Sequence, residues 1–172
     1  QGSDKLLALL EAMRLNEVNE AHGALLEERL QERPSESQTV TRLYSHNIDV
    51  DAINQRHLDA LPGKSHLYRM FTKGARGKIE QLTKSLLAPE ILELKEGAEV
   101  MFVANNFSEG FVNGSRGQVV DFEDDKPVVL LMNGKHITVS LHSWSLNEDG
   151  RVRAEVSQLP IRLAWAITIH KS

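Results

Sequence analysis

Hydrophobic residues in the first part of the chain recur at helical spacing. Over residues 3–14 they form one stripe, and over residues 17–33 a second set faces inward while charged residues face outward. Ser3 or Asp4 can cap the first helix, and Pro34 with the polar residues after it ends the second. The two apolar sets are Leu6, Leu7, Leu10 and Met13, then Ala21, Leu25, Leu26 and Leu30. This pattern predicts an N-terminal helical hairpin with a solvated outer face.

The pattern then changes to the alternation of a strand. Residues 39–45 are short, rich in β-branched side chains and flanked by polar residues, which indicates a strand. Asp49 can cap a helix over residues 50–60, with Ile53 and Leu58 facing inward, and Pro62 with Gly63 stops it. A strand followed by a helix is half of a parallel α/β unit, so the predicted fold class is α/β.

Between residues 99 and 160 the chain reads as short strands divided by turns. Three of the breaks are the hairpin dipeptides Asn113-Gly114, Asn133-Gly134 and Asp149-Gly150. One of the predicted strands covers residues 135–144 without a break. Four or five strands at this spacing predict a small antiparallel SH3-like β-barrel over about residues 97–160. Residues 161–172 then return to a buried apolar segment.

Composition narrows the range of functions. The chain of 172 residues has 20 basic and 24 acidic residues, a net charge of −4, so any nucleic-acid binding has to be local rather than by bulk charge. Residues 64–84 carry six cations and one acid, whereas residues 85–125 carry nine acids and two cations. The absence of cysteine excludes disulfides and Cys-based zinc sites. No apolar run approaches the ~18 residues of a membrane span, which predicts a cytoplasmic protein with no membrane partner.

Two polar clusters follow strand-like segments. The first opens the predicted helix, where backbone N–H groups favour anions. The second ends the last apolar segment and combines a hydroxyl, an imidazole and an ammonium group, which suit a phosphate. The ends of strands are where ligand sites of α/β sheets commonly lie. The clusters are Ser45, His46 and Asn47, and Thr168, His170 and Lys171.

Arg116 is a third candidate. The narrow turn of residues 113–117 presents its guanidinium at the mouth of the predicted barrel, where it can reach a phosphate or stack on a base. Each of these candidates, taken alone, also has a purely structural interpretation. Residues 74–77, Gly-Ala-Arg-Gly, read as a flexible turn, with a backbone-clamping nucleic-acid loop as the alternative. The histidines show no metal-binding spacing, so no metal site is predicted.

Taken together, these motifs are specific to one protein family. Residues 97–122, followed by a strand pair and residues 158–172, closely resemble the C-terminal half of RecD-like superfamily 1 DNA helicases. The branch with the greatest similarity is that of the petite-integration-frequency (PIF) helicases. Residues 39–61 resemble the first strand and helix of that family's second RecA-like domain, and the opening helices resemble those after its Phe-Arg-Gln motif.

This resemblance implies a domain organisation. Residues 1–34 would lead into the second RecA-like domain (2A), of which residues 35–63 and 161–172 would be parts. Residues 64–160 would form the inserted 2B domain with its SH3-like barrel, a wall or pin against the displaced strand. The two polar clusters would contact the DNA backbone.

The resemblance also implies an activity. Family members move 5′ to 3′ on single-stranded DNA with ATP and Mg²⁺, act on forks, and serve DNA repair and recombination. Their compartment is the cytoplasm in bacteria and the nucleus or mitochondrion in eukaryotes. This chain has neither the Walker A nor the Walker B motif, so it carries no catalytic residue and is expected to hydrolyse no ATP without the N-terminal RecA-like (1A) domain. The alternative is a stand-alone SH3-like module that binds nucleic acid or protein.

Overall fold

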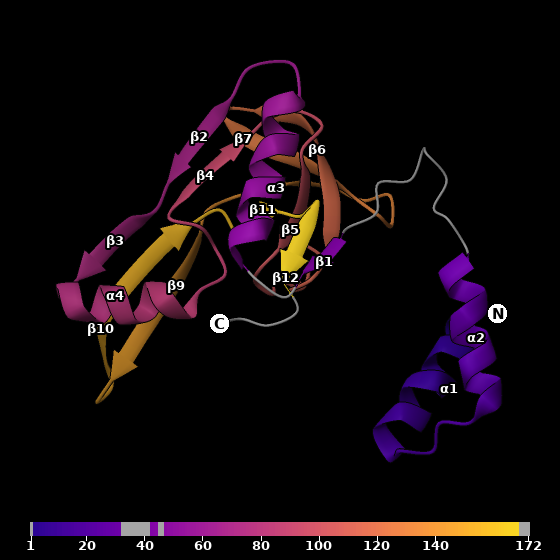
Figure 1. The fold of residues 1–172 in the computed structure, drawn as a ribbon. Coiled ribbons are helices and arrows are strands. Elements are labelled where there is room, and N and C mark those ends of the chain that lie inside the picture. Colours follow the sequence, from indigo (N-terminus) through magenta and orange to yellow (C-terminus); the bar gives the residue numbers. More distant parts are fainter. Residues whose placement is uncertain (1, 32–41, 45–46, 169–172) are drawn as a thin grey trace. The chain divides into compact units, whose positions relative to one another are not determined.

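The computed structural model describes residues 2–31, 42–44 and 47–168 (Figure 1). The chain divides into two compact units, Gln1–Val40 and Thr41–Ser172. Within the described residues, no helix combines the length and the apolar character that crossing a membrane requires.

The first unit contains two helices, as predicted. Helix α1 spans Gly2–Leu15 and α2 spans Glu20–Gln31. The side-chain Oδ1 of Asn19 accepts hydrogen bonds from the N–H groups of residues 21 and 22, so α2 begins three residues later than predicted. The predicted inward face is wrong: Leu9 and Ala12 are the buried apolar residues of α1. Exposed instead are Leu6, Leu7, Leu10, Met13, Leu26 and Leu30.

The second unit opens with a parallel strand pair. Strand β1, Arg42–Tyr44, pairs in parallel with β12, Ala166–Thr168, and helix α3, Asn47–Ala60, follows β1. This confirms the predicted strand-helix half of an α/β unit. The predicted cap is wrong, because α3 begins at Asn47 and Asp49 lies inside it.

An antiparallel sheet of five strands forms the main core. Its order is β11 (Ile161–Leu163), β5 (Glu99–Phe102), β6 (Arg116–Glu123), β7 (Lys126–Leu131) and β8 (His136–Thr138). Phe102 and Phe111 stack in this core with ring centroids 4.1 Å apart. The antiparallel strands are confirmed, but no pairing between β8 and β11 closes them in the described part of the chain. The SH3-like barrel is therefore not confirmed.

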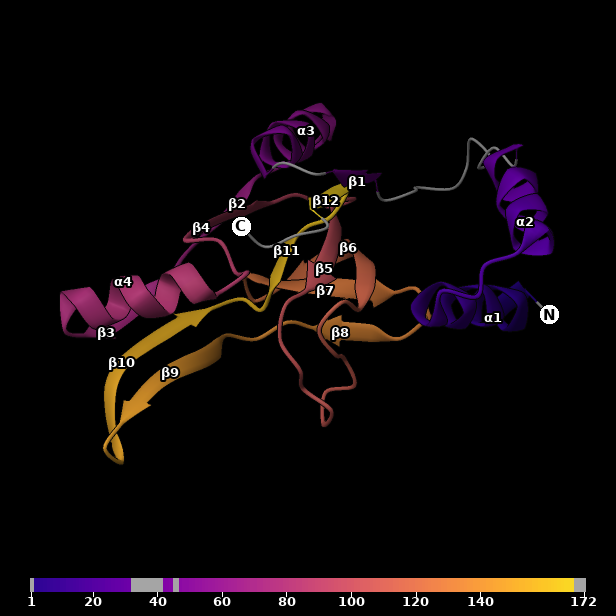
Figure 2. The ribbon, with the colours of Figure 1, turned by 60° about the horizontal axis from the view of Figure 1, so that its bottom comes forward.

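A separate sheet of three strands was not predicted. Its order is β3 (Phe71–Gly74), β10 (Arg151–Gln158) and β9 (His142–Glu148), and helix α4 (Arg76–Ser85) packs against one side of it (Figure 2). The predicted single strand 135–144 is divided between β8 and β9. The N–H group of buried Val139 donates to the Pro127 carbonyl and extends the β7-β8 pairing by one residue, after which the chain crosses to β9. Residues 74–77 are a junction from strand to helix rather than a flexible turn.

A two-stranded ribbon joins these sheets. Strand β2, His66–Arg69, pairs antiparallel with β4, Ile91–Leu94. The fully buried side chain of Gln158 donates from Nε2 to the carbonyl of Pro89 at 3.0 Å and accepts at Oε1 from the N–H of Leu159 at 2.9 Å. This amide fastens the end of β10 to the segment that leads into β4.

Candidate nucleic-acid interface

The strands that lead to the two predicted polar clusters end side by side. In the register of β1 and β12, Tyr44 lies opposite Thr168, the last described residue of its strand. Parallel strands end at the same edge of a sheet, so the chain leaves both strands there. Asn47 is the first residue of α3. The other members of the two clusters, Ser45, His46, His170 and Lys171, lie outside the described residues.

Asn54 of α3 holds β12 at its first residue, Ala166. Its Nδ2 donates to the carbonyl of Ala166 at 2.9 Å, and its Oδ1 accepts from the N–H of the same residue at 2.9 Å. Only 3% of Asn54 is exposed. On the other side of β12, the N–H of Arg42 donates to the Trp165 carbonyl. The amide of Asn54 therefore takes the place that a further strand would have beside β12.

Sequence reasoning missed Asn54, although a signal was available. Val50 and Leu58 are both fully buried on α3, and Asn54 lies midway between them at i+4 and i−4. A polar residue in the middle of a buried stripe has to be hydrogen-bonded, since an unpaired buried amide costs several kcal/mol.

A cavity of about 550 Å³ lies beside this edge. Thr168 and Asn54 line it, together with Lys84, Asp51 and Arg162. The Arg162 guanidinium on β11 lies 3.9 Å from the Asp51 carboxylate on α3. Cations and acids share the lining, so binding here would depend on individual contacts rather than on a broad positive field.

Arg116 lies at the start of β6, in the five-stranded sheet. It is half-buried and lies opposite Met101 of β5, and its charge also acts on the carboxyl of Glu99 in the same strand. Burial raises the pKa of Glu99, while the Arg116 charge and a hydrogen bond from Gln118 oppose that rise. Among the interactions of the described residues, none joins Arg116 to α3 or to Thr168. Arg116 thus belongs to a different sheet from Thr168.

The side chains of the types that bind metals do not gather at one place in the described residues. In the ranges that the structure describes, no group of three or more His, Asp or Glu side chains is positioned to hold a metal ion.

Comparison with known proteins gives consistent matches. The family model described as "DNA helicase Pif1, 2B domain" matches residues 74–122. The ATP-dependent DNA helicase PIF1 of Xenopus laevis is 33% identical over 100% of this chain and 28% of its own length. The ATP-dependent DNA helicase Pif1 of Bdellovibrio bacteriovorus is 35% identical over 99% of this chain and 39% of its own length. The chain therefore spans between a quarter and two fifths of these curated relatives.

Solved structures give the same result for the fold. Pif1 from Bacteroides sp. in complex with ADP-AlF4 matches with a TM-score of 0.79 and 28% identity, covering 98% of this chain and 40% of that one. Bacteroides Pif1 bound to ssDNA matches with a TM-score of 0.63 and 29% identity over the same shares. A structure of two coordinating Pif1 helicases at forked dsDNA matches with a TM-score of 0.64 and 27% identity, covering 97% of this chain and 37% of that one.

Proposed function

This chain belongs to the Pif1 helicase family, and on that premise we propose that it is a C-terminal part of an ATP-dependent 5′-to-3′ DNA helicase. Its role is to hold single-stranded DNA at the edge of β1 and β12 and to present a strand-separation surface. The observation that carries this proposal is the parallel register of Tyr44 with Thr168, since it directs both predicted polar clusters to one edge.

The proposed domain boundaries follow the strand pairing. Residues 1–34 lead into a 2A domain that contains residues 35–63 and 161–172, and residues 64–160 form an inserted 2B domain. The parallel pairing of β1 with β12 supports the first assignment, and the match of the 2B family model to residues 74–122 supports the second. Strand β11, Ile161–Leu163, is the exception, because it lies in the stretch assigned to 2A but pairs with β5 of the inserted part.

The proposed DNA contacts are made by short donors and by cations. At the edge of β1 and β12, hydroxyl, amide, imidazole and ammonium groups bind successive phosphates, and Arg116 makes a separate contact from the five-stranded sheet. Phosphate contacts of this kind do not distinguish sequence, as a translocating enzyme requires. The residues at the edge are Ser45, His46, Asn47, Thr168, His170 and Lys171.

In the full-length enzyme, ATP and Mg²⁺ are bound with the help of the domains outside this chain. In this proposal the 1A domain supplies the phosphate-binding loop, and closure of the cleft between the two RecA-like domains alternates their hold on the strand. This chain contributes one of the two holds. The partners are single-stranded and forked DNA, in support of which solved relatives are described with ssDNA and at forked dsDNA. The compartment is that of the host's DNA: the cytoplasm of a bacterium, or the nucleus or mitochondrion of a eukaryote.

Fluorescence anisotropy with labelled single-stranded oligonucleotides tests the proposal. The chain should bind with an affinity that falls as salt rises, and Lys171→Ala should flatten the slope of log K against log salt by about 0.7. Lys126→Ala, an exposed lysine of the five-stranded sheet, is the matched control and should leave the slope unchanged. Indifference of the wild-type chain to DNA would favour the stand-alone binding module instead.

A further inference from the structure

The sheet of β3, β10 and β9 has one covered and one open face. Leu82 of α4 packs with Ala154 and Val156 of β10 in a buried cluster, which Trp144 and Leu146 of β9 join. Side chains alternate between the faces of a strand, so the residues between these buried ones lie on the face away from α4. Figure 2 shows α4 on one side of this sheet only.

The strand register gives the composition of the open face. One row across the sheet consists of Phe71, Ser157 and Ser143, and the two serine hydroxyls lie 2.6 Å apart. The next row, about 7 Å along the strands, consists of Lys73, Glu155 and Ser145. Phe71 is 66% exposed in a sheet that already has its own apolar core. The open face thus carries one aromatic ring, three hydroxyls, a lysine and a glutamate.

The segments that build this sheet are basic in an acidic chain. Residues 71–85 and 142–158 together carry six cations and four acids, a net charge of +2, whereas the whole chain carries −4. Three of the four acids pair within these segments: Glu80 with Arg76, Glu148 with Lys78, and Asp149 with Arg153. The fourth acid, Glu155, lies opposite Lys73. The net charge of +2 therefore belongs to Lys84 and Arg151, while Lys73 has the carboxylate of Glu155 as its cross-strand neighbour.

We propose that the open face of the β3-β10-β9 sheet is a second contact for single-stranded DNA, in which one base stacks on Phe71 and the adjoining phosphate binds Lys73. This inference rests on the proposed function. An aromatic ring with a nearby cation is how proteins hold single strands without reading sequence, because every base has a stacking face. The serine hydroxyls donate to the sugar and phosphate oxygens beside the stacked base.

The experiment separates stacking from charge in the 172-residue chain. Phe71→Ala should weaken binding to a single-stranded oligonucleotide at least about fivefold and leave the salt slope unchanged, because stacking releases no counterions. Lys73→Ala should flatten the slope by about 0.7. Phe71→Trp should restore binding, which a merely structural role of Phe71 would not predict. Photocrosslinking of a 5-bromouracil oligonucleotide, followed by peptide mapping, should mark the peptide that contains Phe71.

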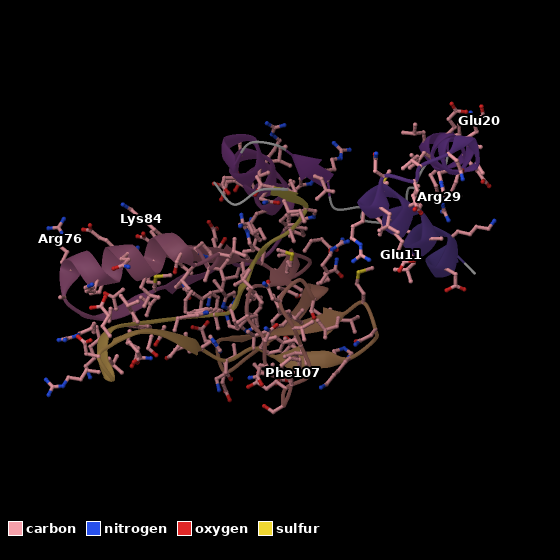
Figure 3. All side chains as sticks on the ribbon, turned by 90° about the horizontal axis from the view of Figure 1, so that it is seen from below. Glu11, Glu20, Arg29, Arg76, Lys84 and Phe107 are labelled. Atoms are coloured by element: carbon pink, nitrogen blue, oxygen red, sulfur yellow. The ribbon has the colours of Figure 1, made fainter. Side chains whose placement is uncertain are left out.

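Two matched controls keep the test specific. Phe107 is 81% exposed on the loop before β6, in the other sheet (Figure 3), and Phe107→Ala should bind as the wild type does. Lys126→Ala should keep the full salt slope. If the wild-type chain binds DNA and Phe71→Ala binds equally well, or if the crosslink maps to the Phe107 loop, the second contact is refuted while the proposed function stands. If the wild-type chain binds no single strand, the proposed function itself fails.

Discussion

At the scale of single residues, two buried amides satisfy backbone groups at the ends of strands. Asn54 pairs with both backbone groups of Ala166, and Gln158 bonds the carbonyl of Pro89 and the N–H of Leu159. An amide carries its donor and its acceptor on two separate atoms, so it can bond a backbone N–H and a backbone carbonyl at once, whereas an ionised carboxylate has no donor. Each of these residues fixes the place where one strand meets a different part of the fold.

Replacement of Asn54 should therefore destabilise the chain. Asn54→Ala leaves the N–H and carbonyl of Ala166 unpaired in a buried position, and the expected loss is about 2–4 kcal/mol of unfolding free energy. Urea denaturation followed by circular dichroism measures it. Gln55→Ala is the matched control, because Gln55 bonds only the exposed Asp59 one turn away and its loss should cost under about 0.5 kcal/mol. Equal losses in the two variants would contradict the anchoring role of Asn54.

The raised pKa of Tyr68 leads us to expect a loss of stability at alkaline pH. Burial, and next to it the charge of Asp125, raise the pKa of Tyr68 to about 12. The folded pKa exceeds the unfolded value of about 10, so the folded state keeps the proton longer. The stability that Tyr68 contributes is thus complete below pH 10 and is lost as the pH rises through about 12.

Comparison with Tyr68→Phe isolates this contribution. The difference in unfolding free energy between wild type and variant should be constant from pH 7 to about 9 and should shrink above pH 10. The variant also loses the hydrogen bond from the Tyr68 hydroxyl to the Asp125 carbonyl, which sets the constant difference. Urea unfolding at each pH gives the values, and a difference that stays flat to pH 12 would refute the raised pKa.

At the scale of elements, Gly74 decides whether β3 pairs with β10. It has a φ of +127°, and a Cβ there would meet the Arg153 carbonyl oxygen and lie 2.8 Å from the Ala154 Cα. Gly74→Ala should therefore strain or open this pairing, with an expected loss of about 2–3 kcal/mol. Gly77, three residues on in α4, has open space where a Cβ would lie, so Gly77→Ala should be neutral or stabilise by up to about 1 kcal/mol. Thermal unfolding of both variants is the measurement, and the prediction fails if their melting temperatures shift alike.

Sequence patterns of a few residues were enough to predict the elements that depend only on neighbouring residues. Asn113-Gly114 does not join two paired strands directly, because it lies in the loop between β5 and β6. The strand before α3 and the hairpins at Asn133-Gly134 and Asp149-Gly150 follow from short stretches of sequence. The division of residues 135–144 between two sheets does not, since it depends on the pairing of β8 with β7 and of β9 with β10. Asn54 likewise acquires its role from Ala166, 112 residues further along the chain. The alternation of polar and apolar residues carries no information about such distant partners.

At the scale of the whole molecule, charge and chemistry are distributed unequally. The chain is acidic overall, yet the segments that form the β3-β10-β9 sheet carry a net charge of +2. Binding of DNA would then concentrate on a few contacts, and its salt dependence would be modest. For the isolated chain we expect a small slope of log K against log salt, in the range set by two or three phosphate contacts. A broadly basic protein would have a steep slope.

The last prediction concerns ATP. Gly63-Lys64-Ser65 matches the last three residues of the phosphate-binding loop motif. The first glycine of that motif would have to lie at position 58, which is occupied by Leu58, a fully buried residue of α3. These three residues follow the end of a helix and cannot cradle a phosphate as a strand-to-helix loop does. The isolated chain should therefore release no phosphate from ATP above background, with or without single-stranded DNA. In the full-length helicase, Lys64→Ala should leave DNA-stimulated phosphate release within about twofold of wild type. Loss of hydrolysis in that variant, with folding intact by circular dichroism, would mean that Lys64 is the phosphate-binding lysine and that this chain carries part of the ATP site.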